Sequence, residues 1–214
     1  MNRRQALKNI GLGAGIIVVG PTTLSLLQSC KNDPDLNWEP VFLSVSNGYA
    51  LKQILEVILP ATDTPGANDL NLAAFIDAYM DEVASEERRS NFSRSANAFA
   101  TAFKEQFDKE PEKGDEKEYK QIVEKFLRAT PEQREDYVRR NTETQDPMDK
   151  DPEDNMDFES GAYSYLNDVR EMGIWAWKTS EEIGEKVLWY DPIPGQYIPC
   201  GPVTELGKGK AMSL

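Results

Sequence analysis

The sequence predicts an all-α protein, a small helical bundle with an irregular C-terminal tail rich in proline and glycine. Between residues 49 and 188, apolar residues recur at steps of three and four, which is the spacing of a buried helix face. No stretch shows the sustained alternation of apolar and polar residues that is typical of a half-buried strand. Residues 189–214 contain four prolines and four glycines, too many for a long helix.

The first helix is predicted at residues 49–59. Its apolar residues recur at helical spacing, and Pro60 ends it because proline cannot continue the backbone hydrogen-bond pattern. Pro65 and Gly66 then predict a tight turn, since proline fixes φ and glycine tolerates positive φ.

Two further helices are predicted after this turn. The second covers residues 70–83, with Asp69 or Asn71 as its N-cap, because both side chains carry oxygens that can accept hydrogen bonds from free backbone N–H groups. The third covers residues 85–107, and its aromatic spacing predicts a core stripe. The apolar side of the second helix consists of Leu72, Phe75, Ile76 and Tyr79, and the stripe of the third consists of Phe92, Phe99, Phe103 and Phe107.

The second half of the chain predicts three more helices. One lies near residues 119–128, after a charged loop. The next begins after Thr130, which forms a capping box with Gln133. The last runs over residues 161–188 and is expected to break near Gly173, because glycine weakens a helix interior.

An acidic loop precedes the last helix, and its oxygen-bearing residues alternate as in a calcium loop: Asp149, Asp151, Glu153, Asn155 and Asp157. However, Asp154 stands where an EF-hand loop requires glycine, and Ser160 stands where it requires glutamate. We therefore interpret the segment as a solvated loop.

Composition excludes several classes of function. The net charge is −13, and removing residues 1–29, with three basic and no acidic side chains, leaves 21 basic against 37 acidic, or −16. Such a surface repels phosphate backbones, so we expect no nucleic-acid partner. The chain has no histidine, no GxGxxG and no P-loop motif, so we expect neither a histidine-dependent catalytic centre nor a cofactor or metal site of its own.

The N-terminus resembles a twin-arginine export signal. Arg3 and Arg4 precede a weakly hydrophobic stretch, Ile10 to Leu27, that is diluted by four glycines and Pro21. Such signals export proteins that have already folded, often around a cofactor. The alternative is a plain signal anchor with positive residues on the cytoplasmic side.

Cys30 ends this segment in the sequence LQSC, which resembles a lipobox. The cysteine would be acylated and would hold the mature chain on a membrane. The alternative is a disulfide with Cys200, which we otherwise expect to be structural. We therefore expect a lipoprotein signal at residues 1–29, a tether at 30–48 and a helical domain at 49–214. The expected location is the cell envelope, on the periplasmic face, with display on the outer surface left open.

Two segments resemble the gluconate 2-dehydrogenase subunit 3 family: ILPATDTPGANDLNLAAFID at 58–77 and TSEEIGEKVLWYDPIPGQYIPC at 179–200. The resemblance implies a non-catalytic small subunit of a membrane-associated dehydrogenase. It implies a large partner subunit of the glucose–methanol–choline class that holds FAD, and often a third, cytochrome c subunit that holds haem. The small subunit would carry the folded flavoprotein through export and anchor it.

The stretches that most resemble the family are two loops whose backbone is fixed, and we expect them to form a partner interface, because a rigid loop loses little entropy on binding. One is the turn, and the other is the start of the tail, whose aromatic residues are of the kind enriched at binding hot spots. The alternatives are that both segments serve only the fold, that the tail lies across its own domain, that Asp63 and Asp191 act in a carboxylate-based hydrolase, or that the chain is a free-standing lipoprotein that binds another envelope component. The predicted interface residues are Thr62, Asp63, Thr64, Pro65, Gly66, Trp189, Tyr190, Asp191, Pro192, Pro194, Gly195 and Tyr197.

Overall fold

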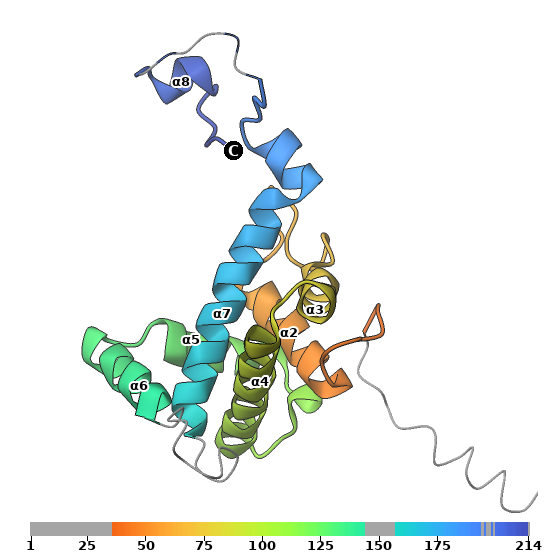
Figure 1. Cartoon of the computed structure of the whole chain (residues 1–214), viewed down its shortest axis with the longest axis vertical. Coiled ribbons are helices and arrows are strands. Elements are labelled where there is room, and N and C mark those ends of the chain that lie inside the picture. The colour runs from red at the N-terminus through yellow and green to blue at the C-terminus, as the bar shows by residue number, and fades with distance from the viewer. Residues whose placement is uncertain (1–35, 144–156, 194, 196–197, 199, 214) are drawn as a thin grey trace, which may run out of the picture. The chain divides into compact units, whose positions relative to one another are not determined.

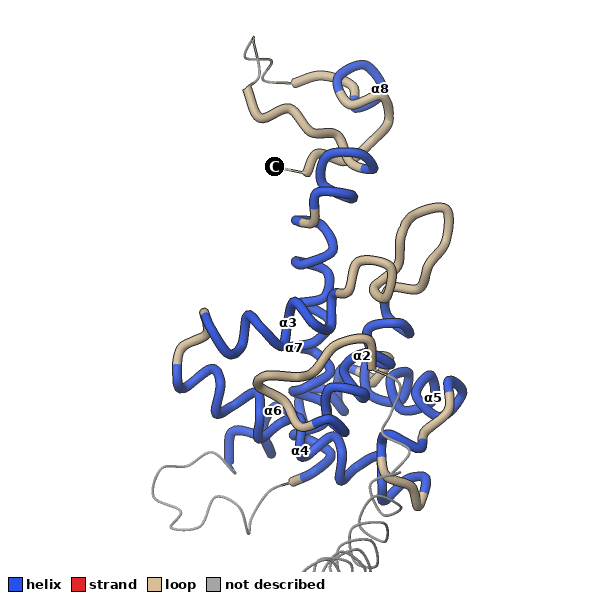
Figure 2. The backbone as a smooth tube through the Cα atoms, turned by 90° about the vertical axis from the view of Figure 1, so that its right-hand side faces the viewer, coloured by secondary structure: helices blue, strands red, loops and turns tan. Residues whose placement is uncertain are grey.

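The computed structural model describes residues 36–143, 157–193, 195, 198 and 200–213. The elements are α2 (Val45–Ile58), α3 (Leu72–Glu82), α4 (Glu86–Phe107), the 3₁₀ turn η1 (Pro111–Lys113), α5 (Glu116–Leu127), α6 (Pro131–Glu143), α7 (Phe158–Thr179), the π-helical turn η2 (Glu182–Val187) and α8 (Val203–Leu206) (Figure 1). In these residues the only β-type pairing is an isolated bridge between Trp189 and Met212, so the prediction of an all-α fold is confirmed (Figure 2).

Several predicted features lie outside the described residues. They are the export signal with Arg3 and Arg4, the lipidation site Cys30, and most of the acidic loop considered for calcium. Asp157, the one described member of that loop, caps α7 by accepting hydrogen bonds from the backbone N–H groups of Glu159 and Ser160.

The folded part begins earlier than the predicted boundary at Tyr49. Helix α2 starts at Val45, because the Ser44 hydroxyl accepts a hydrogen bond from the Asn47 N–H and caps the helix. Leu43 is buried in the core, and the compact unit extends back to Leu36. Residues 36–48, which the sequence assigned to the tether, therefore belong to the compact unit.

One buried carboxylate fixes this leading segment. Asp77 of α3 accepts hydrogen bonds from three consecutive backbone N–H groups: Val41 at 2.7 Å, Phe42 at 3.3 Å and Leu43 at 2.8 Å. Asp77 is only 1% exposed, so these backbone N–H groups supply the hydrogen-bond partners that a buried carboxylate needs.

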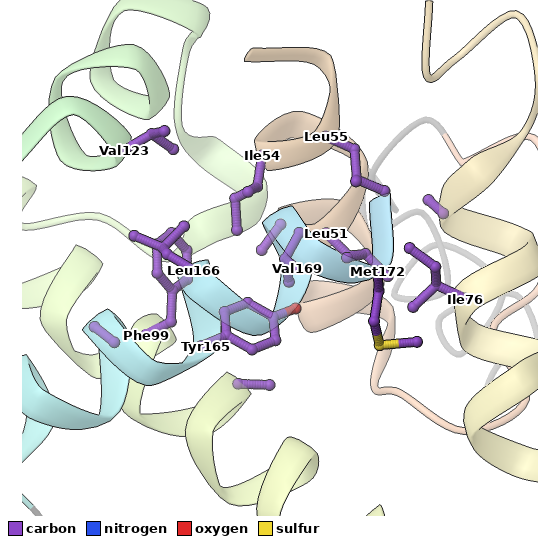
Figure 3. Close-up of a cluster of buried hydrophobic side chains, with 14 of the residues drawn as sticks. Leu51, Ile54, Leu55, Ile76, Phe99, Val123, Tyr165, Leu166, Val169 and Met172 are labelled. Carbon is purple, nitrogen blue, oxygen red and sulfur yellow. The ribbon is translucent and has the colours of Figure 1, made fainter. Parts of the chain in front are cut away.

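Helix α7 is the central element of the bundle and packs against α2, α3, α4, α5 and α6. Its buried side chains Tyr165, Leu166, Val169 and Met172 join the core cluster drawn in Figure 3. Each such side chain contributes roughly 1.5–3 kcal/mol when it leaves water. Their partners in that figure include Leu51, Ile54 and Leu55 from α2, Ile76 from α3, Phe99 from α4 and Val123 from α5.

The predicted break near Gly173 is wrong, because α7 runs unbroken from Phe158 to Thr179. A Cβ atom at Gly173 would lie 2.6 Å from Leu55 Cδ2, so this glycine lets α2 approach α7 closely. The helix ends at Thr179, nine residues before the predicted end, and η2 follows.

Two capping boxes start the helices on either side of Ala129. The predicted box of α6 is confirmed, since Thr130 and Gln133 exchange hydrogen bonds between side chain and backbone. Helix α5 starts at Glu116, before the predicted residue 119, because Asp115 and Glu118 form a second box. Residues 116–118, which were expected to belong to the charged loop, are therefore the first residues of α5.

Candidate functional site

The turn between α2 and α3 is fixed by its own backbone. The Thr62 N–H donates to the Thr64 carbonyl at 3.0 Å, and the Gly66 N–H donates to Asp69 Oδ2 at 2.9 Å. A Cβ atom at Gly66 would lie 2.4 Å from the backbone nitrogen of Ala61, so only glycine fits. Asp69 therefore bonds within the turn, while Asn71 holds the N-cap position of α3 without a capping bond from its side chain, whose Oδ1 accepts a hydrogen bond from Asn37 Nδ2–H at 2.6 Å.

The turn is also attached to the end of α7. The indole Nε1–H of Trp177 donates to the Pro65 carbonyl oxygen at 2.9 Å, across 112 residues of sequence. Thr62 and Asp63 remain exposed at the tip, and Gly66 is buried beneath them. The turn thus has a bonded inner side, as the fold-only alternative expects, and a free outer side that a partner can reach.

The tail closes on itself around Trp189. The Trp189 N–H donates to the Ala211 carbonyl at 2.8 Å, and the Ser213 N–H donates to the Trp189 carbonyl at 2.9 Å. Gly207 is buried against this indole, since a Cβ atom there would lie 2.7 Å from Trp189 Cε3. The tail is therefore a closed loop held by its own backbone bonds.

The predicted interface residues of the tail differ in exposure. Trp189 and Asp191 are partly exposed, Tyr190, Pro192 and Gly195 are exposed, and Pro194 and Tyr197 lie outside the described residues. Cys200, expected to be structural, is exposed and free among the described residues.

In the described part of the chain, no hydrogen bond or ion pair joins the turn to the tail. Their shared neighbour is the last part of α7, where Trp177 holds the turn and where Ser213 of the tail borders a hollow of about 390 Å³ beside Trp175. Asp63 and Asp191 therefore sit on two separately held segments.

An exposed aromatic cluster lies at the same end of α7, and the sequence reasoning missed it. The Trp175 ring lies 5.4 Å from Tyr79 and 5.7 Å from Phe75, measured between ring centroids. Phe75 was assigned to the apolar side of its helix, but it is 45% exposed. A signal was available, because Phe75, Tyr79 and Val83 recur every four residues and widen the apolar stripe of α3 beyond what one packing partner needs.

A salt bridge stands beside this cluster. Arg88 Nη1 of α4 lies 3.1 Å from Asp168 Oδ2 of α7, and both side chains are partly buried. Burial raises the pKa of the Asp168 carboxyl, and the guanidinium of Arg88 partly offsets that effect. The pair links α4 to α7 next to the aromatic residues.

The described residues were also searched for metal and membrane features. They contain no group of three or more histidine, cysteine, aspartate or glutamate side chains placed to hold a metal ion. Within the same residues, no helix combines the length and the apolar character needed to cross a bilayer.

The fold and these surfaces define a class of protein, a small helical bundle. Near the C-terminal end of α7 it carries a hydrogen-bonded turn, a tail held by its own backbone bonds and a set of exposed aromatic rings. The chain belongs to the gluconate 2-dehydrogenase subunit 3 family, whose model matches residues 47–195. That family is one of accessory subunits in a membrane-associated dehydrogenase complex. The match includes the turn and the start of the tail, and confirms the resemblance found in the sequence. No curated protein and no solved structure matches the chain.

Proposed function

We propose that this chain is a non-catalytic subunit that carries a folded FAD-containing dehydrogenase subunit through twin-arginine export and anchors it to a membrane. One observation carries the proposal: a chain of an accessory-subunit family begins with the paired arginines of a signal for folded cargo. An escort explains both facts, because a partner that folds around FAD in the cytoplasm needs an export address.

Each part of the chain has its own task in this proposal. Arg3 and Arg4 supply the export address, Cys30 takes the acyl chains, and the bundle binds the partner. A cytochrome c subunit with haem would complete the complex as the electron acceptor. The outer side of the turn and the exposed part of the tail would contact the partner, since a loop already fixed by its own bonds loses little entropy on binding.

The test is affinity purification of the full-length tagged chain from membranes of its native host. We expect an FAD-containing polypeptide to co-purify in stoichiometric amount, with dehydrogenase activity toward an artificial electron acceptor. In cells carrying Arg3→Lys and Arg4→Lys together, both polypeptides should stay in the cytoplasm. Normal export of the flavoprotein in that double variant would contradict the escort role.

Cys30→Ser tests the anchor separately. We expect the variant to lose acyl labelling and to leave the membrane fraction with its flavoprotein, because the thiol that carries the acyl chains is gone. Cys200→Ser is the matched control and should keep both the label and the location. Undiminished labelling of the Cys30 variant would refute the lipidation site, and purification without any FAD-containing chain would favour a free-standing lipoprotein.

A further inference from the structure

A continuous apolar surface joins α3 and α7, and we call it the aromatic face. It consists of Phe75, Tyr79, Val83, Ile174 and Trp175. Val83 is 64% exposed, and Phe75, Ile174 and Trp175 are each more than two-fifths exposed. The rings contact one another, so their positions are already fixed in the isolated bundle. A prearranged aromatic surface suits binding, because few side chains must be ordered when a partner docks.

A cavity of about 450 Å³ opens into this face. The bottom of this cavity is rigid, because Met172 is buried in the core and Arg88 forms a salt bridge with Asp168. Such a cavity can receive an anchoring side chain from a partner, which is how interface hot spots are built. The lining residues are Tyr79, Val83, Ala84, Ser85, Arg88, Glu171, Met172 and Trp175.

The edge of the face around Val83 is acidic. Glu171 lines the cavity, and Glu82 and Glu86 flank Val83 and Ser85 in the sequence. All three are exposed, and none forms an ion pair with a described residue. On the opposite side, Lys178 borders the hollow beside Ile174.

These charges indicate which kind of partner can bind the aromatic face. A second copy would place the acidic edge of one chain of net charge −13 near that of another, and anionic lipid headgroups would meet the same repulsion. A protein surface with an apolar projection flanked by lysine or arginine complements both the rings and the carboxylates.

We propose that the aromatic face is the principal binding surface for the catalytic dehydrogenase subunit, which inserts an apolar side chain beside Trp175 and places basic side chains against Glu82, Glu86 and Glu171. This inference rests on the proposed function. The face also adjoins the tail, since Ser213 borders the hollow next to Trp175.

Two pairs of matched variants test the proposal in the full-length tagged chain purified from native membranes. Val83→Glu buries a charge in the interface, whereas Val138→Glu makes the same change on α6, where Val138 is 56% exposed. Glu171→Lys reverses a charge beside the cavity, and Glu135→Lys makes the same change on exposed α6. The readout is moles of FAD recovered per mole of tagged subunit.

We expect Val83→Glu to lower the recovered FAD at least tenfold and Glu171→Lys severalfold, while both α6 variants match the wild type. The melting temperature of each isolated variant should stay near that of the wild type, because all four sites are exposed. Full FAD recovery with Val83→Glu would overturn the inference while leaving the escort role intact. Absence of FAD from the wild-type preparation would instead overturn the proposed function. A lower oligomeric mass of isolated Val83→Glu would show that a second copy occupies the face, and would also overturn the inference.

Discussion

Two pairs of aromatic rings in this bundle have nearly the same geometry and opposite surroundings. Phe99 and Tyr165 lie 5.6 Å apart in the core, where both are fully buried. Phe75 and Trp175 lie 5.7 Å apart on the surface, where both are nearly half exposed. Ring contact alone therefore does not distinguish a residue that holds the fold from one that is free for binding. Burial makes the distinction, and it can be tested by mutation.

The largest expected effect is that of Phe99→Ala. Removing this ring should lower the free energy of unfolding by about 3–5 kcal/mol, because it leaves a cavity in the core. Phe75→Ala should cost less than about 1.5 kcal/mol, since the ring is half exposed and its loss opens no cavity. Chemical denaturation of the purified variants measures both values. Equal decreases in the free energy of unfolding would show that burial does not distinguish the two pairs.

The two glycines of the family-matched loops should also differ. Gly66→Ala forces a Cβ atom against the Ala61 backbone, which cannot move like a flexible side chain, so we expect a loss of about 1–3 kcal/mol. Gly195→Ala meets no atom within 4 Å and should change stability little. Thermal unfolding of both variants checks this, and a stable Gly66→Ala protein would show that the turn is not held as described.

Two neighbouring tryptophans of α7 give a smaller contrast. Trp177→Phe removes the hydrogen bond to the Pro65 carbonyl and should lower the free energy of unfolding by about 0.5–1.5 kcal/mol. Trp175→Phe removes no hydrogen bond formed with a described residue and should cost less. Amide hydrogen exchange of residues 62–66 supplies the local readout, and exchange should be faster in the Trp177 variant alone.

The smallest expected effect concerns acid and the capping box of α5. The backbone N–H of Glu118 lowers the pKa of Asp115, and the Lys109 ammonium lowers the pKa of Glu118. Since both folded pKa values lie below the unfolded ones, this stabilisation is present at neutral pH and is lost as pH falls through the folded values. Asp115→Ala should lower the melting temperature at pH 7 and make the melting temperature less dependent on pH in the acidic range. Asp115→Asn should keep the cap. Identical acid profiles for wild type and Asp115→Ala would contradict this.

The sequence predicted the elements better than their ends. Every helix of the bundle from α2 to α7 was located, α6 from its capping box and the main core helices from apolar periodicity, because burial of one face imposes the spacing. The errors at Ser44 and Asp115 arose because a polar cap looks like loop until its backbone bonds are known. The error at Gly173 has another cause: a glycine that weakens a helix in isolation can also make room for a side chain of a neighbouring helix, here Leu55 of α2.

The candidate site was predicted only in part, for a physical reason. The turn and the tail were singled out because proline fixes the backbone and glycine permits conformations that other residues avoid, so both residues mark irregular segments locally. The aromatic face was missed because Phe75 and Trp175 lie far apart in the sequence, and only the packing of α3 on α7 brings them together. Exposure of an apolar residue depends on how many neighbours a helix has, and periodicity does not report that number.

The Asp77 carboxylate, together with the bond from Asn37 to Asn71 at the start of α3, also determines where mechanical load would enter the fold. For a chain held at Cys30, as proposed above, tension along the leading segment reaches the bonds from Val41, Phe42 and Leu43 before it reaches α2. Those bonds transfer the pull sideways into α3, the helix that also carries Phe75, Tyr79 and Val83. A partner seated on the aromatic face would then share one load-bearing helix with the membrane anchor, and the cap of α2 at Ser44 would be shielded from the strain.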